Sequence, residues 1–304
     1  MRFNIDFAGK RKIFFTISIA ITVLGIASLL IYGLNLGVDF RSGTTLDITT
    51  GRSVTMDEIE ALFAEAGTNP NITLAGNNQD RVNARFDRVL TEAERNGIIA
   101  AFQAKYGEEN ISYEENTVDA EMAREFGRNT IIYVGLASLL IALYVIIRFE
   151  WRFSLAGLIS LIHVAFVIVS IFSIFKLEVN LTFIAAVLTM IGYAINDTIV
   201  IFDRIRDNLK TAKLKTAEDV HRLTNESLHQ TLTRSINTGL TVLVVAILLM
   251  VMGSESIRLF SLAMVIGLVV GVYSSICIAA PLWMVLKVQS IKSAKRRTAV
   301  KTAG

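Results

Sequence analysis

Six long runs without a charged residue recur along the 304-residue chain and limit the folds it can adopt. They cover residues 13–34, 129–147, 153–175, 179–196, 235–254 and 259–286. A helix needs about 20 apolar residues to cross the hydrocarbon core of a bilayer, and each run is near or above that length. The composition agrees, because 53% of the residues are hydrophobic and 19% are charged. The sequence therefore predicts a polytopic α-helical membrane protein with six transmembrane helices.

The positions of the basic residues predict how the chain is oriented. Lysine and arginine collect before the first run, between the second and third, between the fourth and fifth, and after the sixth. The positive-inside rule places these regions and both termini in the cytoplasm. The net charge of +3 then reflects topology and contact with anionic lipid, so nucleic-acid binding is not expected. The predicted parts are a cytoplasmic N-terminus (1–12), a first transmembrane helix (13–36), an extracytoplasmic domain (37–128), five further helices (129–287) with a cytoplasmic connection at about 203–232, and a basic tail (288–304).

The segment between the first two helices is polar and has its own secondary-structure pattern. Two capping boxes, Thr55–Glu58 and Thr91–Glu94, predict helices that run to residue 66 and to about residue 106. Alternating residues predict strands at 44–49, 71–75, 81–86 and 111–118. This order of elements is the ferredoxin-like α+β arrangement, which carries many functions. The segment has no cysteine, histidine or glycine-rich phosphate loop, so we expect a binding or mechanical surface.

Residues 119–128 are charged and lead into the second transmembrane helix without a flexible spacer. One interpretation is that this segment transmits movement of the helix to the outer domain. The other is that a stiff helical start simply continues above the bilayer.

Asp197 is the candidate functional residue, because 18 uncharged residues precede it. An acid inside a membrane is costly unless it faces a partner or water, so it is a candidate for proton or ion handling. Thr182, Thr189, Asn196 and Asp203 repeat at seven-residue intervals nearby. This stripe is too polar to face lipid, and it predicts a surface that points into the bundle or toward a partner.

Arg234, at the start of the fifth helix and directly before its uncharged run, is the predicted counterpart of Asp197, and Thr238 and Thr241 share its helical face. An acid stays ionised beside a guanidinium and gains proton affinity when the guanidinium moves away, so the pair would form a proton switch. Alternatively, Asp197 approaches the cytoplasmic interface together with Asp203, and Arg234 is an interfacial anchor. His163 in the third run is either a partner in an interhelical hydrogen bond or a proton relay.

The sixth run carries Gly267 and Gly271 followed by Ser274 and Ser275, which predict close helix packing. Its 28 residues exceed the hydrocarbon thickness, so a tilt or a bend near Pro281 is expected. The chain has no Walker, HExxH or GxSxG motif, so ATPase, zinc-protease and serine-hydrolase activities have no support, and no cofactor or metal is expected.

Several motifs together resemble the SecF family of membrane subunits from the bacterial protein-export machinery. They are Gly37–Gly43, Gly192–Arg206, Thr231–Thr238 and Gly271–Ile276. The sequence departs from the family at Ala194, where serine is usual, and at Ser42, where glycine is common.

This resemblance implies a six-helix half of an RND-like pair in the inner membrane, without a hydrolytic site. SecD would complete the pair, beside the SecY–SecE–SecG channel and YajC, and proton flow would help unfolded preprotein to leave the channel. The family's intramembrane acid falls on Asp197 and its fifth-helix arginine on Arg234. Around them we expect a proton pathway that includes Asn196, Thr198 and Asp203, and after the first helix a motif formed by Gly37, Asp39, Phe40 and Gly43.

Three functions compete for this sequence. The first is a proton-driven accessory subunit of protein translocation. The second is a scaffold that stabilises its partners without using energy. The third is half of an RND-type small-molecule exporter, which a single small outer domain and six helices disfavour.

Overall fold

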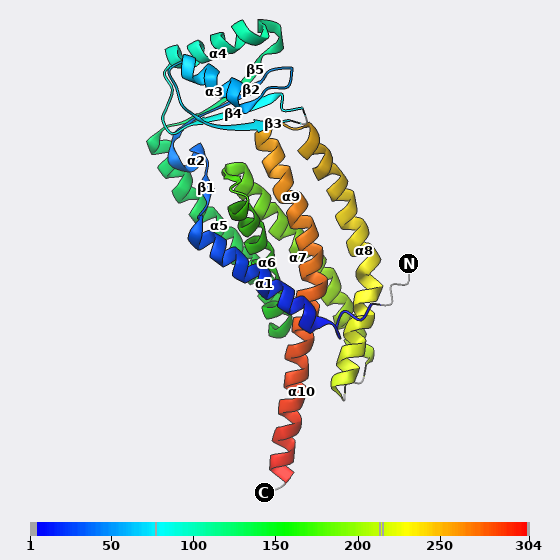
Figure 1. The fold of residues 1–304 in the computed structure, drawn as a ribbon. Helices are drawn as coiled ribbons and strands as arrows, with labels where there is room; N and C mark the ends of the chain where they lie inside the picture. Colours follow the sequence, from blue (N-terminus) through cyan, green and yellow to red (C-terminus); the bar gives the residue numbers. More distant parts are fainter. Residues whose placement is uncertain (1–4, 77, 213, 215, 303–304) are drawn as a thin grey trace.

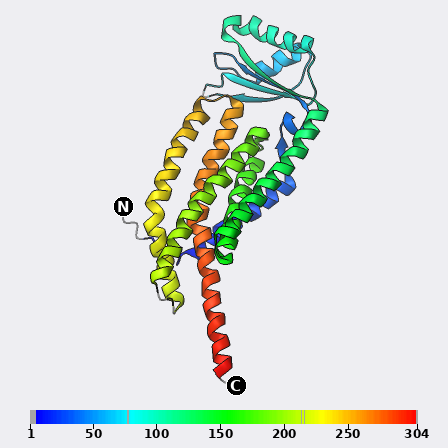
Figure 2. The same cartoon turned by 180° about the vertical axis from the view of Figure 1, so that it is seen from behind.

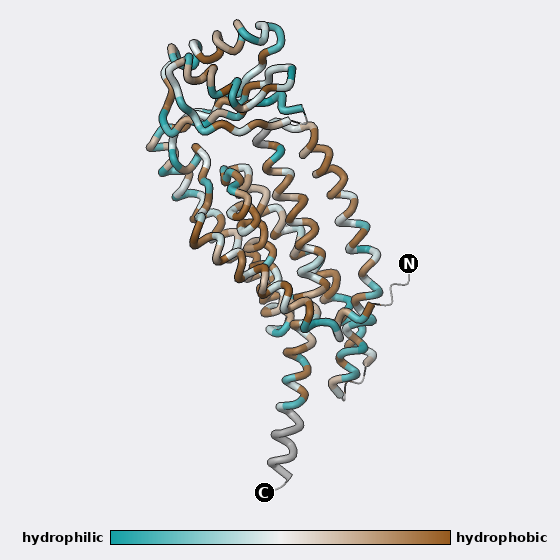
Figure 3. The backbone as a smooth tube through the Cα atoms, in the orientation of Figure 1, coloured by the Kyte–Doolittle hydropathy of each residue, from teal (hydrophilic) through white to brown (hydrophobic). Residues whose placement is uncertain are grey.

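The computed structural model describes residues 5–76, 78–212, 214 and 216–302. Parts of the predicted N-terminal segment and basic tail, residues 1–4 and 303–304, lie outside the described residues. A small domain with a β-sheet lies at one end of a helix bundle, and the last helix extends beyond the other end (Figures 1 and 2). Apolar residues follow the bundle, whereas polar residues concentrate in the sheet domain and at the opposite end (Figure 3).

Six helical segments of the described chain are long and apolar enough to cross a membrane, which confirms the predicted number. The last segment is interrupted by a π-helical turn, Ser275–Ala279 (η2). The helices are α1 (Arg11–Ile31), α5 (Ala120–Arg148), α6 (Trp151–Ile174), α7 (Leu181–Thr211), α8 (Ala217–Met252), α9 (Glu255–Ser274) and α10 (Ala280–Thr302).

The helices extend beyond the uncharged runs at several ends. Asp119 caps α5 by accepting hydrogen bonds from the backbone N–H groups of Glu121 (2.9 Å) and Met122 (2.8 Å), so the charged segment after it is helical. The predicted connection at about 203–232 is mostly helix, because α7 continues to Thr211 and α8 begins at Ala217. Asn208 of α7 joins these extensions by donating a hydrogen bond to Ser227 of α8 (2.8 Å).

The sheet domain has the predicted order of strands and helices. Its strands are paired antiparallel in the order β3-β4-β2-β5, and α3 and α4 pack on one face over Leu46, Ile48 and Val82. The elements are β2 (Gly43–Thr49), α3 (Met56–Glu65), β3 (Asn71–Ala75), β4 (Arg81–Phe86), α4 (Glu92–Tyr106), the short 3₁₀ helix η1 (Glu108–Asn110) and β5 (Ser112–Val118).

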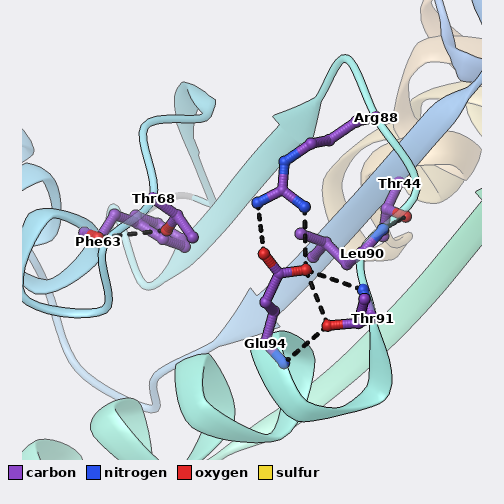
Figure 4. A network of polar contacts seen from close by, with 7 residues as sticks. All are labelled: Thr44, Phe63, Thr68, Arg88, Leu90, Thr91 and Glu94. Carbon is purple, nitrogen blue, oxygen red and sulfur yellow. Dashed lines mark hydrogen bonds and ion pairs between the residues drawn. The ribbon is translucent and has the colours of Figure 1, made fainter.

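The two predicted capping boxes have different outcomes. At α4, Thr91 accepts a hydrogen bond from the Glu94 backbone, and Glu94 accepts one from the Thr91 backbone (3.0 Å), as predicted (Figure 4). Arg88 adds two bonds to Glu94, and these partners lower the pKa of Glu94 to about 2. At α3 the helix begins after Thr55 as predicted, but the Thr55 side chain makes no capping bond, so that part of the predicted box is wrong. Glu58 pairs with Lys105 of α4 at 3.0 Å and also accepts a hydrogen bond from the Thr55 backbone.

The sheet domain is attached to the helix ends at two places. After α1, the short strand β1 (Asn35–Leu36) pairs in parallel with β6 (Glu178–Val179), which directly precedes α7. Arg85 of β4 donates a hydrogen bond to Asn35 (2.9 Å), and Arg81 of the same strand donates one to the backbone oxygen of Gly253 at the end of α8 (2.5 Å). The face of the sheet opposite α3 and α4 thus meets the ends of the helices (Figure 1).

The last transmembrane segment is irregular just before Pro281. Proline has no N–H to donate to Cys277 four residues earlier, and its ring would clash with that carbonyl in a regular α-helix. A π turn widens the backbone over Ser275–Ala279 and avoids the clash, so the helix continues without a break.

Candidate functional site

Asp197 lies half-buried on α7, and its Oδ2 atom is buried without a hydrogen-bond partner in the described structure. The hydroxyls of Ser235 on α8 and Ser275 in the π turn are its polar neighbours, and the guanidinium of Arg234 is close enough to interact with it electrostatically. Tyr193, one turn earlier on α7, also has a buried hydroxyl without a partner. A buried carboxylate oxygen without a partner is costly in either ionisation state, which marks this position as a candidate site.

Three consecutive residues where α9 passes into the π turn connect this site to the rest of the bundle. The hydroxyl of Tyr273 contacts Ser18 of α1 at 2.9 Å, and Ser274 contacts Ser160 of α6 at 2.8 Å. Ser275 contacts Thr198 of α7 at 2.9 Å. Successive helical residues point about 100° apart, so each of these three side chains meets a different helix. The segment around the π turn is therefore the polar centre of the bundle.

Arg234 is exposed on α8, next to the buried Ser235. In the part of the chain that the structure describes, no ion pair within 4.0 Å joins Arg234 to Asp197. The predicted counterpart is therefore a neighbour of the acid without being its salt-bridge partner. The sequence did not indicate that Ser235 and Ser275 would meet Asp197, because three helices distant along the chain supply these groups.

The remaining residues of the predicted proton pathway lie on different sides of α7. Thr198 is 1% exposed and donates a hydrogen bond to the Ala194 carbonyl (2.9 Å), so it belongs to the buried cluster. Asp203 instead forms ion pairs with Arg148 of α5 (3.3 Å) and Arg206 (2.8 Å). Six residues correspond to about 600° of helical rotation, which turns Asp203 away from the face of Asp197.

The predicted polar stripe lies on the outside of the chain. Thr182, Thr189 and Asn196 are all exposed, and Asp203 is partly exposed. The stripe therefore does not point into the bundle of this chain. Of the two predicted orientations, only the one toward a partner remains.

His163 of α6 makes an interhelical contact. Its Nδ1 atom lies 3.4 Å from the hydroxyl of Ser274, while its Nε2 atom is buried without a partner. The imidazole therefore lies beside the polar centre, on the side of Ser274 and away from Thr198.

The glycines predicted to pack helices lie where α9 crosses α7. A side chain at Gly267 would overlap the first carbons of Met190, whereas a Cβ at Gly271 would be 3.5 Å from the Cβ of Ala194. α9 therefore lies close against the part of α7 that precedes Asp197.

The motif after the first helix forms the short helix α2 (Val38–Arg41) and its flanks. The backbone N–H of Gly37 donates to Val179 of β6 (2.9 Å), and the partly buried Phe40 packs against the helix core. Gly43 has φ +138°, and any side chain there would collide with the carbonyl oxygen of Phe86. Asp39 is 8% exposed and accepts hydrogen bonds from the Leu181 backbone (2.8 Å) and from Asn116 (3.3 Å).

The fold and the site define a polytopic helical membrane protein with a buried polar cluster at the centre of its bundle. The family described as "Protein export membrane protein SecD/SecF, C-terminal" matches residues 98–289, and the "SecD/SecF GG Motif" matches residues 27–54. The chain belongs to the SecD/SecF family of protein export membrane proteins.

Individual relatives cover this chain almost completely. The protein translocase subunit SecF of Alicyclobacillus acidocaldarius is 39% identical over 97% of both chains. The protein translocase subunit SecDF of Bacillus subtilis is 44% identical over 94% of this chain, which spans only 39% of that relative. A crystal structure of SecDF from Thermus, a translocon-associated membrane protein, has a TM-score of 0.82 at 29% identity, covering 94% of this chain and 39% of that one.

Proposed function

We propose that this chain is a SecF-type subunit that uses the proton gradient across the inner membrane to help complete protein export. Family membership and the names of the relatives support the role in export. The SecDF relative from Bacillus subtilis is much longer than this chain, which supports a separate SecD chain as the partner that supplies the remainder. The SecY–SecE–SecG channel, YajC, unfolded preprotein and membrane lipids are the further partners in this proposal, and nucleic acid is not.

The observation that carries the proton step is the buried, unpartnered Oδ2 atom of Asp197. Hydroxyls of Ser235 and Ser275 lie beside the carboxyl group and, after a small rearrangement, can donate to its ionised form or accept from its protonated form. Arg234 favours the ionised state when it approaches and the protonated state when it withdraws. The site therefore has the components of a two-state proton switch.

The π turn supplies an element that can respond to this switch. Ser275 lies in that turn and contacts Thr198, which directly follows Asp197. π turns occur often at functional sites. Their backbone hydrogen bonds span five residues instead of four, and a local shift can exchange one pattern for the other. Protonation of Asp197 would remove a charge at the contact between α7, α8 and the π turn and let these elements shift.

The proposal includes the orientation and the nature of the outer domain. The strand order β3-β4-β2-β5 with two helices on one face supports a ferredoxin-like domain. The distribution of lysine and arginine supports an extracytoplasmic position for it and a cytoplasmic position for both termini. In this arrangement the gradient supplies the energy, and the chain needs no hydrolytic site.

The test is Asp197→Asn, which keeps the size of the side chain but removes its proton exchange. In vesicles that contain the complete export complex, we expect this change to lower gradient-dependent export about tenfold or more while complex assembly stays normal. Asp207→Asn is the matched control, because it makes the same chemical change on the same helix at an exposed position outside the predicted proton pathway. Normal gradient-dependent export by Asp197→Asn would falsify the proton role and favour the scaffold function.

A further inference from the structure

The helix that carries Asp197 is held at its first residue by an acid from a distant part of the chain. Asp39 of α2 accepts a hydrogen bond from the backbone N–H of Leu181 through one oxygen (2.8 Å). Its other oxygen accepts a bond from the side chain of Asn116 in β5 (3.3 Å). One buried carboxylate thus joins α2, the start of α7 and a strand of the outer sheet.

The start of α7 has two different capping residues. Asn180 accepts bonds from the backbone of Phe183 (2.9 Å) and the hydroxyl of Thr182 (2.7 Å), so it acts only within its own segment. The first N–H groups of a helix lack intrahelical partners, and a carboxylate is favoured there by the helix dipole. Asp39 satisfies one of these groups from a separate element, so it adds a link between elements that Asn180 does not provide.

The elements on both sides of this link are suited to transmit movement. α7 is continuous from Leu181 to Thr211, and Asp197 lies sixteen residues, or about 24 Å, from Leu181. On the other side, Val38 of α2 is buried with Val118 at the end of β5 and Ala123 at the start of α5. A shift of α7 along its axis would therefore pull on Asp39 and on the junction between the outer sheet and α5.

We propose that Asp39 is a positioning residue that couples movement of α7, driven at Asp197, to the outer domain. The inference rests on the proposed function for its driving step. It assigns to the motif after the first helix a mechanical role: Asp39 makes the outer domain follow the helix that carries the proton site. The proton site itself does not include Asp39, because Asp39 contacts the first residue of α7, whereas Asp197 lies near the middle of that helix.

Asp39→Ala removes both bonds, whereas Asn180→Ala removes capping bonds at the same helix end without touching the outer domain. Spin labels at the exposed positions Ala104 of α4 and Thr189 of α7 report the placement of the outer domain relative to the helix. We expect Asp39→Ala to broaden the distance distribution and Asn180→Ala to leave it unchanged. Asp39→Asn, which keeps one acceptor oxygen, should give an intermediate width.

The functional measurement uses vesicles with the complete export complex. We expect Asp39→Ala to retain proton flux but to lower gradient-dependent export about tenfold, whereas Asn180→Ala retains both. The proposal is overturned if the two variants behave alike in distance width and export, or if Asp39→Ala abolishes proton flux. Failure of the proton role itself appears separately, as normal export by Asp197→Asn.

Discussion

At the scale of single residues, the polar groups inside the bundle differ in how well they are satisfied. Thr198 bonds both to the Ala194 carbonyl and to Ser275, so its burial is compensated. Asp197 keeps one oxygen without a bond, although hydroxyls lie beside it. A buried group that already makes all its hydrogen bonds gains none when its surroundings change. An acid with an unbonded oxygen can gain a hydrogen bond when its protonation or its neighbours change. This contrast is the reason why the proposed proton step is assigned to Asp197.

Ser42 has an unusual backbone conformation, and it lies in the segment that the SecD/SecF GG motif matches. Its φ of 64° and ψ of 156° lie in a region that is essentially restricted to glycine and costs other residues about 1–3 kcal/mol. We expect Ser42→Gly to raise the free energy of unfolding by about 1 kcal/mol, after allowing for the greater flexibility of glycine in the unfolded chain. Unfolding in detergent micelles measures this change.

Ser53→Gly is the control for this prediction. Ser53 is exposed, whereas Ser42 is half-buried, and both lie near the start of the sheet domain; Ser53 is absent from the residues with positive φ. Glycine there should be neutral or destabilising. If both substitutions change stability equally, the strain at Ser42 is not relieved by glycine.

At the scale of elements, the last transmembrane segment organises the bundle. Its residues Tyr273, Ser274 and Ser275 contact α1, α6 and α7 in turn, and its glycines allow α9 to lie close to α7. The position of Pro281 explains why the helix widens from Ser275, the last of these three contacts. Packing and polar contact are therefore combined in one continuous segment.

The two glycines of α9 should respond differently to enlargement. Gly267→Ala places a methyl group against the first carbons of Met190, which cannot move without the α7 backbone, so we expect a loss of about 1–3 kcal/mol. Gly271→Ala creates an ordinary contact with Ala194 at 3.5 Å and should cost less. Unfolding in mild detergent with increasing denaturant compares the two variants. Equal losses would show that α7 and α9 are not as close at Gly267 as described.

At the scale of the whole molecule, the sheet domain is docked on the helix ends through polar contacts. Arg85 and Asp39 act near the start of α7, and Arg81 acts at the turn between α8 and α9. Several helices meanwhile expose apolar side chains; Ile131, Leu139 and Ile147 of α5 are examples. A chain with such surfaces relies on lipid or on a partner subunit to cover them, as the proposed pairing with SecD requires.

Arg81→Ala tests the second docking contact. The guanidinium donates to the Gly253 carbonyl that ends α8, and a hydrogen bond from a charged group contributes about 1.5–3 kcal/mol. We expect amide hydrogen exchange in the turn between α8 and α9 to become about tenfold faster or more. Arg88→Ala should leave exchange there unchanged, because Arg88 pairs with Glu94 on the exposed side of the domain. Unchanged exchange in Arg81→Ala would mean that the turn is held by other contacts.

Some features of this protein followed from local sequence alone. A bilayer requires each crossing segment to be long and apolar by itself, so the six helices could be predicted run by run. Strand alternation and capping signals likewise predicted the order of elements in the sheet domain, although the Thr55 side chain does not form its capping bond. Asp197 stood out because an acid in an uncharged run is conspicuous without knowledge of its neighbours.

The tertiary structure decided which groups meet. Crossing angles and depths of α7, α8 and α9 bring Ser235 and Ser275 to Asp197, and helical rotation turns Asp203 toward Arg148 instead. No local pattern indicated that Asp39 would cap a helix that begins at Leu181. Membrane insertion is decided segment by segment, whereas such contacts depend on how all helices pack at once, so only the assembled fold could define the site.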